Sequence, residues 1–123
     1  MKQYEWQACL MAQAKRLQEL GIVQKSLFLH FQHPIHGWRF GLDNDALRTW
    51  GSFAAFNTAE LGIMLNVDCV GVLPEIFNTI EVNAWFEKIT PTITYEAELR
   101  AAFLILALEQ NLLTADEVNQ RIG

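Results

Sequence analysis

The longest uninterrupted apolar run in the chain lies near its C-terminus, from Ala101 to Leu108. It belongs to a longer stretch, Tyr95–Leu113, in which charged and polar residues stand before and after the run. On a helix with about 3.6 residues per turn, the apolar side chains fall on two nearly opposite faces. A helix that is apolar on most sides belongs in a protein core or in a membrane. Because a membrane span needs roughly 20 apolar residues, the pattern predicts a buried core helix.

Short polar signals mark the end of this helix and the start of another. Asn111 suits the left-handed position that follows a helix C-terminus. Thr114 and Glu117 have the spacing of a capping box, in which both side chains serve backbone N–H groups at a helix start. We therefore expect a second, short helix from Thr114, with Val118 and Ile122 facing inward.

The first third of the chain begins with a similar pattern, a predicted helix that ends at a residue suited to the left-handed position. Apolar residues recur every three or four positions in Tyr4–Leu20, which predicts an amphipathic helix that Gly21 would end. The next stretch, Ser26–Gln32, fits either a short helix or a strand with alternate apolar side chains, and Pro34 ends either version. We expect an ordered loop over His33–Leu42, with a brief extended segment where apolar residues alternate with other residues.

Further helices are expected in the middle of the chain. Asp43 or Asn44 is a suitable cap for a helix that runs toward Phe56, because the apolar residues between them repeat at helical spacing. Asn57, with a glutamate three residues later, is a second cap signal and predicts a helix over Thr58–Leu65.

The predicted helix Pro74–Ile89 is apolar on two sides. It is either sandwiched between layers of the protein or has one apolar face free for a partner. Glu81 and Trp85 are the residues of this helix that we expect at such an interface. Together the patterns predict a mainly α-helical single domain over residues 1–123, with six or seven helices around the C-terminal helix and at most a minor pair of short strands.

Composition and charge narrow the class of partner. The 123 residues carry a net charge of −5, which argues against nucleic acids and anionic membranes as partners and favours a basic protein. The plain alternative is that the carboxylates are solvated on helix faces. The two cysteines, Cys9 and Cys69, form no disulfide framework, and the N-terminal residues lack the apolar region of a signal peptide. We therefore expect a cytoplasmic protein.

All three histidines, His30, His33 and His36, occur within one short stretch at intervals of three residues. Imidazole is the commonest metal ligand, so a zinc site or another small-ligand site is one hypothesis. No Cys-x-x-Cys or His-Glu-x-x-His pattern supports zinc, and Pro34 interrupts any regular spacing. The alternative is that these histidines anchor a loop to backbone groups.

Trp38, Arg39 and Phe40 stand together in the expected loop. Tryptophan and arginine are the residue types most enriched at protein-binding hot spots, although the same aromatics could pin the loop to the core. No nucleophile, paired carboxylates or phosphate-binding loop indicates an enzyme, and no cofactor is expected.

We therefore expect a small acidic protein–protein interaction module, of the inhibitor or immunity-protein type, that binds a more basic protein. A homodimer through the predicted Pro74–Ile89 helix is the nearest variant. Metal or small-ligand binding by the three histidines is the alternative.

Overall fold

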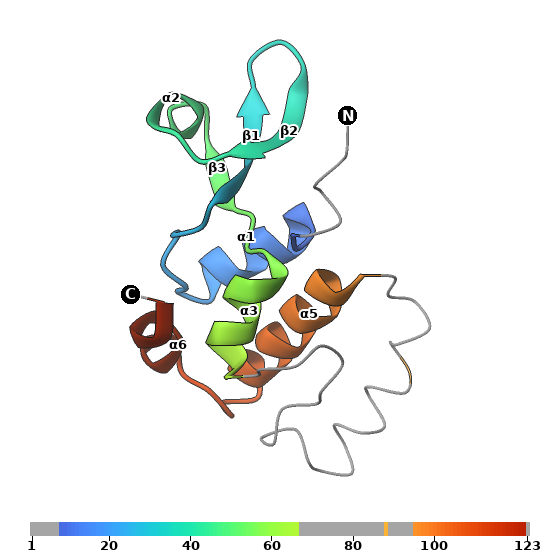
Figure 1. Ribbon diagram of the computed structural model, residues 1–123, viewed down its shortest axis with the longest axis vertical. Helices are drawn as coiled ribbons and strands as arrows, with labels where there is room; N and C mark the ends of the chain where they lie inside the picture. Colours follow the sequence, from blue (N-terminus) through green and yellow to red (C-terminus); the bar gives the residue numbers. More distant parts are fainter. Residues whose placement is uncertain (1–7, 67–87, 89–94, 123) are drawn as a thin grey trace.

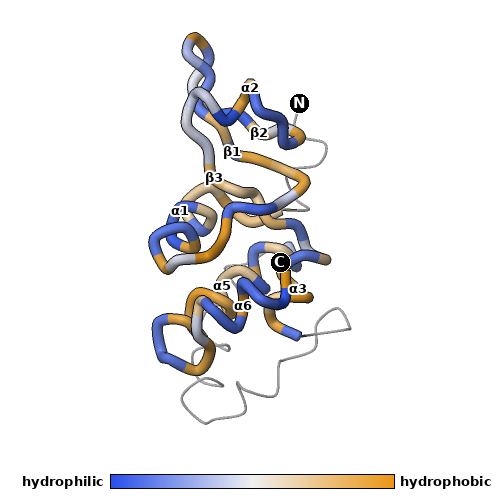
Figure 2. The backbone as a smooth tube through the Cα atoms, turned by 90° about the vertical axis from the view of Figure 1, so that its left-hand side faces the viewer, coloured by the Kyte–Doolittle hydropathy of each residue, from blue (hydrophilic) through white to orange (hydrophobic). Residues whose placement is uncertain are grey.

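A computed structural model describes residues 8–66, 88 and 95–122, and it separates them into a sheet group and a helical group (Figure 1). The described elements are, in chain order, α1 (Met11–Glu19), β1 (Phe28–His33), β2 (Gly37–Leu42), α2 (Asp45–Arg48), β3 (Ser52–Ala54), α3 (Thr58–Leu65), α5 (Glu96–Glu109) and α6 (Ala115–Ile122). In Figure 1 the three strands and α2 occupy one end of the molecule, and the four longer helices occupy the other. Apolar stretches occur in both groups (Figure 2).

The prediction of a mainly α-helical domain is wrong. The described residues form five helices and one antiparallel sheet of three strands in the order β2-β1-β3, which is a mixture of helix and sheet rather than a helical bundle. The error arises largely between Asp43 and Phe56, where we expected one helix. Asn44 does cap a helix, because its Oδ1 accepts a hydrogen bond from the Leu47 N–H at 3.0 Å. That helix, α2, ends at Arg48 after four residues.

Gly51 explains why the chain leaves the helix so early. Its φ of +86° lies in the left-handed region, which glycine adopts without the steric penalty that a Cβ would bring. The chain then continues as β3, so Phe53 and Ala54 belong to a strand and not to the helix face on which their spacing placed them. The stretch that fitted either a helix or a strand became the central strand β1.

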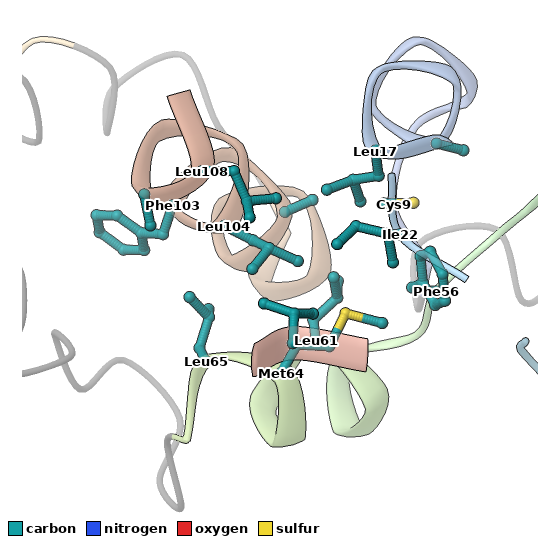
Figure 3. Close-up of a cluster of buried hydrophobic side chains, with 14 of the residues drawn as sticks. Cys9, Leu17, Ile22, Phe56, Leu61, Met64, Leu65, Phe103, Leu104 and Leu108 are labelled. Carbon is teal, nitrogen blue, oxygen red and sulfur yellow. The ribbon is translucent and has the colours of Figure 1, made fainter. Parts of the chain in front are cut away.

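The core lies in the helical group, and α5 has seven buried residues. One face of α5 is buried at Ala97, Ala101 and Leu104, and it packs against α1 and α3. Figure 3 shows Leu104 and Leu108 directed toward side chains of the other helices and of the chain that precedes α1. The prediction of a buried C-terminal helix is confirmed for this face, whereas Tyr95 at its start remains 49% exposed.

Local capping predictions are confirmed at both helix ends that the sequence marked. Gly21 and Asn111 have positive φ values of 95° and 60°. After each, a backbone N–H reaches back to the helix: Ile22 donates to the Leu17 carbonyl at 3.0 Å, and Leu112 donates to the Ala107 carbonyl at 2.8 Å. These are the bonds of a Schellman end, which satisfies carbonyls that the helix leaves unpaired.

The starts of α3 and α6 also follow the sequence. Asn57 Oδ1 accepts from the Glu60 N–H at 2.8 Å, and Glu60 Oε1 accepts from the Asn57 N–H at 2.9 Å, so the predicted capping box and the bounds Thr58–Leu65 are confirmed. At α6, the Glu117 N–H donates to Thr114 Oγ1 at 3.2 Å, and Val118 is buried as expected.

The first helix begins later than predicted. Residues 1–7 lie outside the described part of the chain, and α1 starts at Met11. Before it, Ala8 bridges Asn57, and the Cys9 N–H donates to the Phe56 carbonyl at 2.9 Å, so this segment is extended. The predicted helix Pro74–Ile89, with Glu81 and Trp85, lies outside the described residues apart from Lys88.

Candidate protein-interaction surface

The hairpin of β1 and β2 carries the residues that the sequence singled out. Pro34, Ile35 and His36 form the turn between the strands, and Gly37 begins β2 with a φ of +76°. The turn is held by His33, whose Nδ1 accepts hydrogen bonds from the N–H groups of Ile35 and His36, both at 3.1 Å. Nδ1 is the acceptor in both bonds, so the side chain of His33 closes this turn.

Antiparallel pairing decides which side chains share a face of the sheet. His30 stands opposite Phe40 on β2 and opposite Phe53 on β3, and residues directly opposite each other project to the same side. Successive residues of a strand point to opposite faces. The aromatic and apolar side chains of this set, which we call the aromatic face, are Phe28, His30, Trp38, Phe40, Leu42 and Phe53, and the polar Gln32 lies on the same face opposite Trp38.

Ring contacts run across the aromatic face in all three strands. The centroids of Phe28 and Phe40 are 5.2 Å apart, and those of Trp38 and Phe53 are 5.5 Å apart, both in stacked arrangements. Such pairs stabilise a sheet beyond the area that they bury. Trp38 nevertheless remains 39% exposed and Leu42 66% exposed. The aromatic face is therefore ordered and still presents large apolar side chains on its surface.

The other face of the sheet is covered. Leu29 and Phe31 are buried there, and α2 and Trp50 lie over β1. A Cβ on Gly41 would lie 3.2 Å from the Phe31 ring, which is closer than ordinary van der Waals contact, so the ring would have to shift by a few tenths of an ångström. Trp50 has the same exposed fraction as Trp38, 39%, but its ring contacts Phe31 and His33 on this covered side.

The three histidines do not all converge, since only His33 and His36 lie together. His30 lies on the aromatic face and its Nε2–H donates to the Cys9 carbonyl at 2.8 Å. His33 and His36 lie near the turn with their rings stacked, 4.7 Å between centroids, and the His33 Nδ1 lone pair is already used. In residues 8–66, 88 and 95–122 no group of three or more His, Cys, Asp or Glu side chains is placed to hold a metal ion. The metal hypothesis stays a prediction that this geometry does not strengthen.

Arg39 is the exposed cation of β2, and its guanidinium makes no hydrogen bond or ion pair with any residue in the described part of the chain. Nearby, Arg48 is bound to Asp43 through two hydrogen bonds of 2.7 and 2.6 Å. These bonds lower the pKa of Asp43, since they favour its ionised form. Arg39 is therefore available to a partner, whereas Arg48 is already used within the chain.

A cleft of about 400 Å³ lies between the start of β1 and helices α3 and α6. Its carboxylate Glu60 is fully engaged: it accepts from Ser26 Oγ at 2.6 Å and from the Leu27 N–H at 3.1 Å, in addition to its cap at Asn57. Arg121 donates to the Met64 carbonyl at 2.6 Å. Because these groups are satisfied internally, the cleft joins the two groups of elements and offers little to a ligand.

Cys9 offers no nucleophile. Burial raises the pKa of its thiol to about 12, so the thiolate that would react is absent near neutral pH.

The structure places Trp38, Arg39 and Phe40 together on one strand, as their positions in the sequence required. Sequence reasoning missed Phe28, Leu42 and Phe53 as members of the same surface, because membership depends on which strands pair. The alternation of Trp38, Phe40 and Leu42 was the available signal, and the sequence does not show which strands lie beside it.

No protein-family model, no curated protein and no solved structure matches this chain. None of the helices within the described ranges has the length and hydropathy that a membrane crossing requires.

Proposed function

We propose that this chain is a small protein–protein interaction module that contacts its partner through the aromatic face of the sheet. The observation that carries the proposal is the exposure of Trp38 and Leu42 on an ordered face, at fractions of 39% and 66%. Arg39 lies on the same strand but projects from the opposite face. Exposed apolar patches rimmed by polar residues are typical of interaction sites. Tryptophan and arginine supply a large share of the binding energy at such sites.

The partner that fits the whole chain is a more basic protein. The net charge of −5 attracts a cationic surface and repels an anionic one. Exposed carboxylates such as Glu19, Glu109, Asp116 and Glu117 lie on the helices and supply this attraction during approach. The contact itself is apolar and is made by the sheet. Binding of this kind would block the surface of the partner, as an inhibitor or immunity-type protein does.

The test uses two tryptophans with equal exposure on opposite faces. A partner is identified by cross-linking and mass spectrometry in the host, purified, and titrated by calorimetry against the wild type and two variants. Trp38→Ala is expected to weaken binding about tenfold to a hundredfold, the range of a hot-spot truncation. Trp50→Ala is the matched control, because Trp50 is also 39% exposed but lies on the covered side.

Equal losses for the two variants would contradict the proposal, provided that circular dichroism shows both to be folded. The charge component has its own readout. The association rate is expected to fall as salt concentration rises, since screening weakens attraction between opposite charges. An association rate that does not change with salt concentration would contradict a basic partner but would not contradict contact through the aromatic face.

A further inference from the structure

The two edges of the sheet are protected to different degrees. The β3 edge is three residues long and packs against α1, and its Ala54 N–H donates to Gln24 Oε1 at 2.8 Å. The β2 edge is six residues long, and no strand in the described part of the chain pairs with its outer side. Its sequence, GWRFGL, contains no proline and no lysine, the residues that commonly protect an edge from a further strand.

The hydrogen-bond ladder identifies the backbone groups that point outward from β2. The Asp43 N–H donates to the Leu27 carbonyl at 2.9 Å, so the residues at alternate positions before Asp43 bond to β1. In an antiparallel pair, the residues between them direct their N–H and C=O groups away from the neighbouring strand. On β2 these residues are Trp38, Phe40 and Leu42, whose side chains lie on the aromatic face. The backbone of these three residues can therefore form a ladder with an added strand.

One charge on this edge has no ion-pair partner within the described residues. Arg39 is exposed and projects from the face opposite the aromatic face. Asp43 lies on the same face, but Arg48 donates to both of its carboxylate oxygens, at 2.7 and 2.6 Å. Asp45 belongs to α2, which packs against β1. The guanidinium of Arg39 is therefore the charge that an added strand would meet.

The position of Arg39 in the ladder brings it close to one residue of such a strand. Its N–H and C=O point toward β1, so across the outer edge it belongs to a non-hydrogen-bonded pair. In an antiparallel pair of this kind the two Cα atoms are about 4.5 Å apart, and the side chains are in their closest contact. Opposite charges at directly opposed positions stabilise a strand pair, and like charges destabilise it. Arg39 therefore discriminates between the strands that reach this edge.

We propose that the β2 edge binds an extended segment of another protein as an antiparallel fourth strand, with a carboxylate opposite Arg39. The segment has apolar residues opposite Trp38, Phe40 and Leu42, where its backbone completes the ladder. Their side chains extend the aromatic face, and the Asp or Glu of the segment lies on the other face beside Arg39. In this mode of recognition the main-chain hydrogen bonds give affinity, and the alternate side chains give specificity.

The charges at the edge favour this occupant over a basic or wholly apolar strand. A basic residue opposite Arg39 would put like charges in the closest pair of the ladder, and an apolar residue would leave the guanidinium without a partner. The described carboxylates outside the sheet group lie on α1, α3, α5 and α6, at the other end of the molecule (Figure 1). Arg39 therefore sets the charge at the edge itself, although the whole chain is acidic. The inference goes beyond the proposed function, because it concerns the backbone edge and does not require a basic protein on the aromatic face.

The experiment titrates two synthetic peptides into the isotope-labelled protein and follows the β2 amide signals by NMR, which detects weak binding. The first peptide is acetyl-Val-Thr-Val-Glu-Val-Thr-amide. In the antiparallel register its valines stand opposite the three outward residues and its glutamate stands opposite Arg39. The second peptide has lysine in place of the glutamate. We expect the glutamate peptide to bind the wild type about fivefold more tightly than the lysine peptide.

Arg39→Glu is the matched variant, because Arg39 is exposed and reversal of its charge should reverse the preference. The variant is expected to bind the lysine peptide about fivefold more tightly than the glutamate peptide. A preference for the lysine peptide in the wild type as well would show that the net charge of −5 decides, and it would overturn the proposal. If the variant does not fold, the comparison of the two peptides on the wild type decides the question.

A third peptide tests the ladder separately from the charge. Methylation of the glutamate peptide at the nitrogen of the valine opposite Phe40 removes one N–H donor and keeps every side chain. This peptide is expected to bind about tenfold more weakly, because a hydrogen bond of the ladder is lost. Equal binding of the methylated and unmethylated peptides would show that the peptide does not add a strand.

Amide hydrogen exchange of the wild type shows what occupies the edge. The amides of Trp38, Phe40 and Leu42 are expected to exchange rapidly in the protein alone and more slowly with the glutamate peptide, whereas those of Arg39 and Gly41 should not change. Slow exchange at every protein concentration before peptide is added would mean that another part of this chain covers the edge. Slow exchange at high concentration alone would mean that a second copy covers it. Either result, or the failure of both peptides to bind, would overturn the fourth strand and leave contact through the aromatic face to its own test.

Discussion

The helical group and the sheet group bury their apolar side chains to very different extents. In the helical group, Leu17, Leu61 and Leu104 are completely buried, and α5 packs against α1 and α3 (Figure 3). In the sheet group Leu29 and Phe31 are buried on one face. On the other face Trp38 remains 39% exposed and Leu42 66% exposed.

This difference indicates a division of roles. Burial of apolar surface contributes roughly 25 cal/mol per Å², so most of the stability comes from the helical group. A sheet that is packed on one side has its other side free to contact a second molecule. The two groups are joined by Glu60, which caps α3 and also accepts hydrogen bonds from Ser26 and Leu27 just before β1.

The largest difference in the free energy of unfolding is expected between two leucine-to-alanine truncations, one in the helical group and one in the sheet group. Leu104→Ala removes a fully buried side chain at the centre of the core and should lower the free energy of unfolding by about 2–5 kcal/mol. Leu42→Ala, at a site that is 66% exposed, should change it by less than about 0.5 kcal/mol. Urea denaturation followed by circular dichroism measures both. Similar losses would show that the sheet is part of the core.

The next largest loss of stability is expected when the contact between the helical group and the sheet group is weakened. Glu60→Gln replaces an ionised acceptor that serves three donors, and it should cost about 1–3 kcal/mol in denaturant unfolding. Glu109→Gln is the matched control, because Glu109 is exposed and has one ion pair, to Arg16. Equal stability of the two variants would mean that Glu60 does not join the groups.

Local chemistry in the sequence was sufficient to locate several helix ends. Asn57, Thr114, Gly21 and Asn111 act on neighbouring backbone groups within a few residues, so their roles follow from spacing alone. The sheet could not be found in the same way. The apolar spacing from Ala46 to Ala54 also fits a helix. The segment Ser52–Ala54 is a strand because it pairs with β1, which lies earlier in the chain, before α2.

The candidate surface could be predicted from the sequence only in part, for the same reason. Trp38, Arg39 and Phe40 stood out because they are adjacent in a stretch rich in loop-forming residues. Phe53 joins them only through its place opposite His30, which depends on the register of two strands. Side chains that are brought together by strand pairing cannot be grouped from a single sequence, whereas neighbours on one strand can.

Cys9 sits where the two groups meet, and its thiol gives a prediction on pH. Its carbonyl accepts from His30, and burial raises the thiol pKa from 9.0 to about 12. The folded state therefore holds this proton more tightly than the unfolded state. The resulting stability is fully present below pH 9 and is lost as pH rises toward 12, by about 1.4 kcal/mol per pH unit.

Cys9→Ala should remove this alkaline loss, so its unfolding free energy should fall less steeply than that of the wild type above pH 9. Parallel denaturant titrations at several pH values make the comparison. Identical slopes would contradict a buried, neutral thiol. In the wild type, thiol reagents at pH 8 should modify Cys9 only when the protein unfolds.

The smallest effect is expected at the hairpin turn. His33→Leu removes the acceptor for the Ile35 and His36 N–H groups and should destabilise the turn by about 1 kcal/mol. His33→Asn should restore part of this, since its side-chain oxygen can accept from the same turn. Amide exchange of residues in β1 and β2 measures the change. A turn that is as well protected in His33→Leu as in the wild type would show that the histidine does not hold it.

The most direct test of the division between a stabilising helical group and a contacting sheet face is made on the wild-type protein with its partner. Trp38 and Trp50 are equally exposed at 39% and lie on opposite faces of the sheet, so their indole N–H resonances report separately on those faces. On titration of the purified partner, we predict that the Trp38 indole signal shifts or broadens while the Trp50 signal is unchanged. A shift of Trp50 with Trp38 unaffected would contradict the account.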